Sequence, residues 1–203
     1  MPALETSFGL LGLVAVLAYL LGSIPFGIVI ARAFGLGDLR SIGSGNIGTT
    51  NVLRTGSKTA AALTLILDSG KGAIAVLATR WFIGADDTAQ IAGLASFLGH
   101  LFPIYLGFKG GKGVATFLGT AAALAWPVGL AAAATWLVTA LVFRMSSLSA
   151  LVAAASAPIW AALIGVPTMA VLMIAFAALI FVRHKENIAR LRAGTEPKIG
   201  AGK

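Results

Sequence analysis

Seven apolar segments follow one another along the 203-residue chain, and they constrain its fold more than any other feature. A helix needs ~20 mostly apolar residues to cross the hydrocarbon core of a bilayer, and several of these segments fall short of that length. Hydrophobic residues make up 58% of the chain and charged residues only 11%, a balance that excludes an ordinary soluble domain. The sequence predicts an all-α integral membrane protein with a single polytopic domain, residues 1–203. The segments lie near residues 7–33, 58–82, 88–106, 113–125, 127–143, 148–165 and 167–183.

Basic residues indicate how these segments are oriented. Seven spans with the N-terminus outside would place all the Lys- and Arg-rich connections on the cytoplasmic side. Thirteen of the fifteen Lys and Arg residues lie at or beside those connections, and only Lys71 and Arg80 lie elsewhere. This asymmetry is typical of positive-inside orientation. The cytoplasmic connections would be residues 34–57, 107–112 and 144–147 and the tail, 184–203.

The two short segments on either side of Trp126-Pro127 decide the number of spans. Joining them into one broken span would put the loop around Lys109 and the basic tail on opposite sides of the membrane. Trp-Pro is also a good end and start of helices at a membrane interface. We therefore expect seven transmembrane helices, an N-terminus outside and a cytoplasmic C-terminus, with Glu5, Asp86 and Asp87 on the outer face.

The net charge of +8 and the absence of cysteine narrow the chemistry. The orientation accounts for the positive charge. Aromatic residues do not interleave with basic ones as they do on nucleic-acid-binding surfaces, so no nucleic acid partner is expected. Without cysteine the chain can form neither disulfides nor thiolate metal sites nor a covalent thioester intermediate.

A basic glycine loop lies within residues 99–116, between two of the apolar segments. Gly110, Gly111 and Gly113 lack the Cβ atoms that would keep a ligand from the backbone N–H groups, and Lys109 and Lys112 add positive charge. Phosphate is the natural ligand of such a loop. The spacing differs from a Walker A loop, because Gly113 follows Lys112 where Ser or Thr would bind magnesium. A nucleoside triphosphate is therefore not the first expectation.

Two further polar segments lie on the expected cytoplasmic side. The first polar loop, residues 43–54, is dense in small hydrogen-bonding side chains and ends in Arg54. A plain glycine-rich turn needs only two or three such residues, so a loop that wraps a polar headgroup is favoured. The tail begins with His184 and Asn187, which share a face if the last helix continues. A lone histidine at a membrane boundary is commonly an interfacial residue, but its side of the membrane, shared with both loops, favours function.

Two charged residues fall near the middle of the second apolar segment, where charge is costly. Asp68 and Lys71 are three residues apart and can pair on one helix face. No third titratable group is evident nearby, so a buried ion pair that orients the helix is favoured over catalysis. His100 lies at the inner end of its segment, beside the glycine loop, and we expect it to hold that loop by a hydrogen bond.

The three polar segments together match a known pattern. The first contains Gly43-Ser44-Gly45-Asn46, Thr50-Asn51 and Arg54, and the second contains Gly99-His100, Phe102-Pro103 and Phe108-Lys109-Gly110-Gly111-Lys112-Gly113-Val114-Ala115-Thr116. The third contains His184, Asn187-Ile188, Arg190-Leu191, Gly194 and Glu196. All three, in this order and over the whole chain, resemble the motifs of the bacterial PlsY-type acyl-phosphate:glycerol-3-phosphate acyltransferases.

The resemblance implies a small enzyme of the bacterial cytoplasmic (inner) membrane with its active site on the cytoplasmic side. It would transfer a fatty acyl group from acyl phosphate to the 1-position of glycerol 3-phosphate, giving lysophosphatidic acid and phosphate in the first acylation of phospholipid synthesis. Acyl phosphate is already activated, so positioning and charge stabilisation suffice and neither a metal nor another cofactor is expected. Membrane lipid, the two substrates and the enzyme that forms acyl phosphate are the expected partners.

The resemblance also implies roles for individual residues. Ser44, Arg54, His184 and Asn187 would be the catalytic set, with His184 and Asn187 needed for activity or for glycerol 3-phosphate binding, and Glu196 would chiefly support structure. Asp68 and Lys71 are expected to be structural because they form the buried ion pair inferred above. The deprotonating base is either His184 or a phosphate oxygen of the substrate, and the sequence leaves open which basic cluster holds which phosphate. The substrate-binding residues would be Gly43, Gly45, Asn46, Thr50, Asn51, His100, Lys109, Gly110, Gly111, Lys112, Gly113, Thr116 and Arg190.

Three alternative functions fit the sequence less well. An organophosphate transporter would show inverted repeats and discontinuous helices at mid-membrane, and no repeat is found. An acyl-CoA acyltransferase of the soluble type would carry His followed four residues later by Asp, a spacing that neither His100 nor His184 has. A metal-dependent phosphotransferase would need several Asp residues in one helix, whereas Asp68 stands alone.

Overall fold

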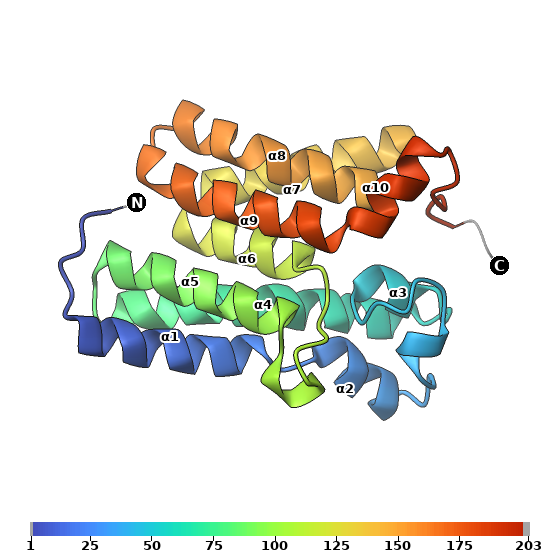
Figure 1. Cartoon of the computed structure of the whole chain (residues 1–203), viewed down its shortest axis with the longest axis horizontal. Helices are drawn as coiled ribbons and strands as arrows, with labels where there is room; N and C mark the ends of the chain where they lie inside the picture. Colours follow the sequence, from blue (N-terminus) through green and yellow to red (C-terminus); the bar gives the residue numbers. More distant parts are fainter. Residues whose placement is uncertain (1, 201–203) are drawn as a thin grey trace. The chain divides into compact units, whose positions relative to one another are not determined.

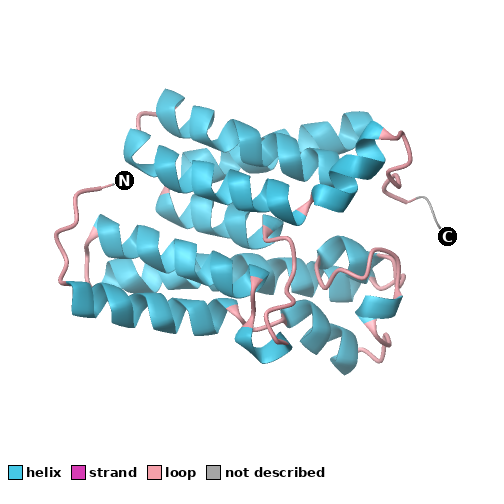
Figure 2. Ribbon diagram, viewed as in Figure 1, coloured by secondary structure: helices cyan, strands magenta, loops and turns pink. Residues whose placement is uncertain are grey.

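The computed structural model describes residues 2–200, and all the regular secondary structure among them is helical (Figure 2). The all-α prediction is therefore confirmed for the described part of the chain. The chain divides into two compact units, Ala3–Leu124 and a second unit that begins at Ala125. Each unit is described by itself.

The first unit is built around α4 (Lys58–Phe82), which packs against α5 (Asp86–Leu101) and α6 (Val114–Leu124) (Figure 1). The other helices of this unit are α1 (Phe8–Gly22), α2 (Phe26–Ala33) and the short α3 (Thr49–Leu53). Helix α1 lies along α5, and both α2 and α3 pack on α4. Single turns of 3₁₀ helix occur at Leu39–Ser41 and Ile104–Leu106.

Glycines allow the helices of the first unit to approach closely. A Cβ atom on Gly99 of α5 would collide with the carbonyl oxygen of Tyr19 in α1, and one on Gly119 of α6 would collide with that of Ser69 in α4. Backbone approach of this kind is how helices associate where lipid removes the hydrophobic driving force. These glycines therefore serve packing, and they bring α5 against α1 and α6 against α4.

The second unit contains α7 (Trp126–Phe143), α8 (Ser146–Leu163), α9 (Ala170–Arg183) and α10 (Lys185–Arg192). Helix α8 packs against both α7 and α9. The predicted helix boundary at Trp126-Pro127 is confirmed, because α6 ends at Leu124 and α7 begins at Trp126 with proline in its first turn. Proline is favoured there because the first helical N–H groups have no partner within the helix.

All seven predicted apolar segments are helical, but not all of them are long enough to cross a membrane. Among the described residues, five stretches are long and apolar enough to span a membrane. A sixth is added if Pro167–Arg183 and Lys185–Arg192, which meet at a bend of 67°, are counted as one. Helix α6 has 11 residues and so rises only ~16 Å, about half of a ~30 Å hydrocarbon core. The five stretches are Phe8–Ala33, Lys58–Phe82, Asp86–Leu106, Trp126–Phe143 and Ser146–Leu163.

Candidate active site

Asn51 organises the first polar loop. Its side-chain nitrogen donates to the carbonyl oxygen of Leu39 at 2.8 Å, and its side-chain oxygen accepts from the backbone N–H of Ser44 at 3.2 Å. The same oxygen lies 3.4 Å from Nη1 of Arg54. The amide is buried, whereas Ser44 and Arg54 are exposed. The structure thus brings together three of the predicted site residues and uses Asn51 to hold the other two.

The backbone path of the first polar loop depends on two glycines. Gly43 has a φ of 54°, and a Cβ there would lie 2.7 Å from the Asn51 side-chain oxygen, so only glycine fits. Gly27 of α2 receives the loop, because a Cβ at that position would collide with the carbonyl oxygen of the buried Ile47. Of the remaining predicted residues in this loop, Gly45, with a φ of 65°, Asn46 and Thr50 are all half-buried.

The backbone of the glycine loop differs from the sequence prediction. The N–H groups of Gly110 and Gly111 were expected to face a ligand, but they donate to the carbonyl oxygens of Leu101 and His100, each at 3.1 Å. The physical reason is that the last turn of a helix leaves carbonyl groups without partners, and the loop folds back on the end of α5 to supply them. Those two N–H groups are therefore used within the protein.

The glycines of this loop are required by packing. A Cβ on Gly111 would collide with Nε2 of His100, and one on Gly110 would collide with the His100 carbonyl oxygen. Gly113 has a φ of 82°, and a Cβ there would lie closer to Cε2 of the Phe97 ring than two carbon atoms can pack. The glycine loop thus packs closely against the end of α5.

The glycine loop keeps three features that suit an anion. Lys109 is exposed and Lys112 is half-buried. Helix α6 begins directly after them, with its first helical hydrogen bond running from Phe117 N–H to the Gly113 carbonyl oxygen at 2.8 Å. The amide end of a helix carries partial positive charge. Of the predicted ligand-binding residues, Thr116 is buried and its hydroxyl donates to the carbonyl oxygen of Asp68 at 2.9 Å.

Arg40, three residues before the first polar loop, contacts the glycine loop, and the sequence analysis missed this contact. Its Nη2 donates to the carbonyl oxygen of Lys109 at 2.9 Å. The sequence offered no signal beyond positive charge, because 69 residues separate the two partners. The segment just before the first polar loop is therefore joined to the glycine loop by a direct hydrogen bond, and both lie in the first unit.

Asp68 and Lys71 form the predicted ion pair, with Lys71 Nζ 2.9 Å from Asp68 Oδ1 and both side chains buried. The expectation that no third titratable group lies nearby is wrong. Nδ1 of His100 lies 3.6 Å from the same carboxylate oxygen. His100 comes from α5, so spacing along α4 could not reveal it.

The tail motif of the second unit is centred on Glu196. Its Oε1 accepts hydrogen bonds from Asn187 Nδ2 and from Ser147 Oγ, each at 2.6 Å. Its Oε2 lies 2.7 Å from Nε of Arg190. Burial raises the pKa of the Glu196 carboxyl, but these three donors lower it by more, so its pKa lies below the usual range. Ser147, in the first turn of α8, is a further residue that the sequence analysis missed.

His184 lies at the bend between α9 and α10 (Figure 1). The two helices meet at 67°, so the last helix does not continue straight as the shared-face prediction required. His184 and Asn187 are both buried. Nδ1 of His184 lies 2.8 Å from the carbonyl oxygen of Ile180, a contact in which the ring nitrogen must be the donor. The basic nitrogen of the neutral ring is then Nε2.

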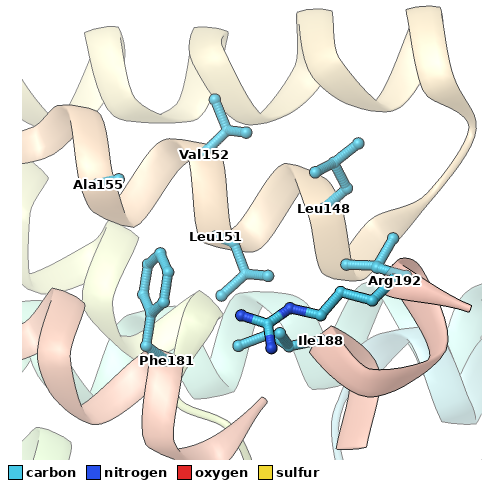
Figure 3. Close-up of a pocket in the computed structure, with 8 residues that line it drawn as sticks. Leu148, Leu151, Val152, Ala155, Phe181, Ile188 and Arg192 are labelled. Carbon is cyan, nitrogen blue, oxygen red and sulfur yellow. The ribbon is translucent and has the colours of Figure 1, made fainter. Parts of the chain in front are cut away.

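An apolar groove of about 500 Å³ lies between α8, α9 and α10 (Figure 3). Its walls come from α8, α9 and α10, and Arg192 supplies its one charged group. A groove of this kind suits an alkyl chain that carries an anionic group. The lining residues are Leu148, Leu151, Val152, Ala155, Phe181, Ile188, Leu191 and Arg192.

Comparison with known proteins places the chain in a family. Residues 12–194 match the family model described as glycerol-3-phosphate acyltransferase. A glycerol-3-phosphate acyltransferase of Jannaschia sp. (strain CCS1) is 67% identical over 199 residues, which cover 98% of each chain. One from Dinoroseobacter shibae is 64% identical over the full length of both chains.

A solved structure agrees with the sequence comparisons. It is that of PlsY (YgiH), an integral membrane glycerol 3-phosphate acyltransferase, in its glycerol 3-phosphate form. The likeness has a TM-score of 0.88 and 43% identity, and it covers 94% of this chain and 96% of that one. The multi-span membrane fold and the resemblance drawn from the three motifs are both confirmed, and the chain belongs to the glycerol-3-phosphate acyltransferase family, as a bacterial PlsY-type protein.

Proposed function

We propose that this chain transfers a fatty acyl group from acyl phosphate to the 1-position of glycerol 3-phosphate, giving lysophosphatidic acid and phosphate. The observation that carries the proposal is the PlsY structure solved in a glycerol 3-phosphate form, which is 43% identical to this chain. A second form of that protein is described as the lysophosphatidic acid form and has a TM-score of 0.85 to this chain. Substrate and product of one acylation are thus named for the relative.

The donor follows from the glycine loop. Two ammonium groups and the start of α6 offer enough positive charge for one phosphoryl group. Acyl-CoA would need further contacts for an adenine and a diphosphate, and acyl carrier protein would need an ordered basic docking face that these short loops can hardly build. Acyl phosphate is the donor that fits, with its acyl chain in the hydrocarbon layer.

The reaction needs only positioning and charge stabilisation. The 1-hydroxyl oxygen attacks the carbonyl carbon, the carbon–oxygen bond to phosphate breaks, and phosphate leaves with the bonding electrons. The hydroxyl proton passes to Nε2 of His184 or to a phosphate oxygen, and the pH dependence of turnover separates these routes. Lys109 and Lys112 balance the charge on the donor phosphate, and Arg54 grips a phosphate bidentately beside Ser44.

The remaining predicted residues have supporting roles in this scheme. Gly43, Gly45, Asn46, Thr50 and Asn51 shape the first polar loop around the headgroup. Gly110, Gly111 and Gly113 shape the donor loop. Asn187 and Arg190 build the tail through Glu196, and neither a metal nor another cofactor takes part.

We propose a topology of seven spans, with the N-terminus outside and all three motifs at the cytoplasmic face of the inner membrane. The basic asymmetry of the loops supports this orientation. Helix α6, packed against α4 and α5, would then form the helical part of one short span and cover about half of the hydrocarbon thickness. The family match over residues 12–194 runs through both compact units and supports their action as one catalytic domain. The enzyme that forms acyl phosphate is the natural partner.

Product formation tests the function. Purified protein in detergent or lipid, given acyl phosphate and glycerol 3-phosphate without magnesium or ATP, should form lysophosphatidic acid. An absolute requirement for magnesium or ATP would contradict the scheme. Single cysteines at positions 86 and 112 of this cysteine-free chain test the topology, because labelling of both from one side would contradict the seven-span arrangement.

A further inference from the structure

We propose that Asp68, Lys71 and His100 form a positioning network for the glycine loop, and that this network sets the affinity for the phosphate-bearing acyl donor. The inference rests on the proposed function, because that assigns donor binding to the loop. It extends the function by giving a buried ion pair, which the sequence explains as helix orientation, a part in substrate binding. The three side chains act through the loop and not by touching substrate.

Asp68 is connected to both ends of the loop. Its carboxylate oxygen Oδ1 lies 3.6 Å from Nδ1 of His100, which precedes the loop at the end of α5. Its backbone carbonyl oxygen accepts a hydrogen bond from the hydroxyl of Thr116 at 2.9 Å, in the first turn of α6 directly after the loop. Asp68 of α4 therefore contacts the residues on both sides of the glycine loop, His100 before it and Thr116 after it.

His100 transmits its position to the middle of the loop in two ways. Its carbonyl oxygen accepts the N–H of Gly111 at 3.1 Å. Its imidazole ring packs so closely on Gly111 that a Cβ atom there would collide with Nε2. A shift of the ring toward the loop would therefore displace Gly111 and with it the neighbouring Lys112, and a shift away would leave Gly111 without its packing partner.

Lys71 keeps the network charged and in place. Its Nζ lies 2.9 Å from Asp68 Oδ1 and donates to the carbonyl oxygen of Ile24 at 3.0 Å. That carbonyl lies at the break between α1 and α2, just before Pro25. A lone carboxylate in this buried position would be costly, so Lys71 allows Asp68 to remain ionised opposite His100. The network thus also ties the junction of α1 and α2 to the loop.

A purely structural ion pair and a positioning network make different predictions. Losing a structural pair lowers stability without favouring one substrate. Disturbing the network changes the geometry of the donor loop, so it raises the KM for the donor and leaves the KM for glycerol 3-phosphate unaffected. The ratio of the two KM changes is therefore the informative quantity.

The test compares Asp68→Asn with Asp87→Asn. Asp87 is the matched control because it is equally buried and accepts hydrogen bonds from Glu5, Thr6 and Thr88 at the far end of α5 from the loop. We expect Asp68→Asn to raise the KM for acyl phosphate about tenfold and to change that for glycerol 3-phosphate by less than about twofold. Asp87→Asn should lower the melting temperature, followed by tryptophan fluorescence, without a selective donor effect.

A second variant covers the case in which Asp68→Asn does not fold. Thr116→Val removes only the hydrogen bond to the Asp68 carbonyl, and we expect it to raise the donor KM about threefold. Because the two residues act on one loop, the double variant should show less than the product of the single effects. Unchanged donor KM in both folded single variants, or an equal rise for both substrates, would overturn the inference. Wild-type protein without activity would instead contradict the proposed function.

Discussion

The first polar loop and the tail are each organised by one hydrogen-bonding side chain, which is a buried neutral amide in the loop and a half-buried carboxylate in the tail. In the loop, the Asn51 amide holds Ser44 and approaches Arg54 at 3.4 Å. In the tail, the Glu196 carboxylate holds Asn187, Ser147 and Arg190 at 2.6–2.7 Å. Charge-assisted hydrogen bonds are shorter and about twice as strong as neutral ones. The hydrogen bonds that hold the first polar loop are therefore weaker than the charge-assisted ones that hold the tail.

This difference predicts different roles for Arg54 in the loop and Arg190 in the tail. Arg190 is paired with Glu196, so much of its charge is already balanced within the protein. Arg54 is exposed and meets a neutral amide, so its charge remains available to an anion. The comparison predicts that Arg54 binds substrate phosphate and that Arg190 chiefly holds the tail.

The largest expected effect comes from Arg54→Lys. An ammonium group keeps the charge but cannot grip a phosphate bidentately, so losing one contact of ~2 kcal/mol should lower kcat/KM roughly thirtyfold. Arg190→Lys is the matched control in the tail and should retain most of the activity. Steady-state kinetics of both variants decide between the two roles. Equal losses of kcat/KM would contradict the different roles of Arg54 and Arg190.

Gly111→Ala should have the next largest effect, through the donor loop. The added methyl group collides with the His100 ring and must displace either the ring or the loop. We expect the KM for acyl phosphate to rise about tenfold with a smaller change in kcat. Loss of glycerol 3-phosphate binding with an unchanged donor KM would reverse the assignment of the two phosphates.

Glu196→Gln should destabilise the fold in a pH-dependent way. The substitution weakens three hydrogen bonds to a charged acceptor and should cost ~2 kcal/mol near neutral pH, with about a threefold loss of activity. Because the pKa of folded Glu196 lies below its unfolded value, its stabilisation is present above the unfolded pKa and is lost as pH falls through the folded pKa. Melting temperatures of the wild type and the variant should converge in acid, and a constant difference would contradict this.

Ser147→Ala should have the smallest effect, because Glu196 keeps its bonds to Asn187 and Arg190. We expect a loss of ~1 kcal/mol in stability and nearly unchanged kinetics. Thermal unfolding of the purified variant checks the first point. A loss of activity as large as that of Glu196→Gln would mean that α8 itself positions the tail.

The helices could largely be predicted from the sequence, because apolar length and helix-boundary residues act locally. The seven apolar segments and the break at Trp126-Pro127 were recognisable in this way. The pair Asp68 and Lys71 was also predictable, since residues three apart share a helix face. The 67° bend at His184 was not, because nothing in the local residues requires it.

The site was predictable in its residues but not in its contacts. The motifs brought Ser44, Arg54 and the glycine loop to attention. The link from Arg40 to Lys109 and the approach of His100 to Asp68 join residues from distant elements, and no spacing rule encodes them. The N–H groups of Gly110 and Gly111 were assigned to a ligand because the end of α5, which takes them, becomes visible only in three dimensions.

Donor choice tests the central claim most directly. Purified enzyme with glycerol 3-phosphate should be supplied in turn with acyl phosphate, acyl-CoA and acyl carrier protein carrying the same acyl chain, in the absence of any enzyme that makes acyl phosphate. We predict that lysophosphatidic acid forms with acyl phosphate alone. Comparable product from acyl-CoA or acyl carrier protein would contradict the account.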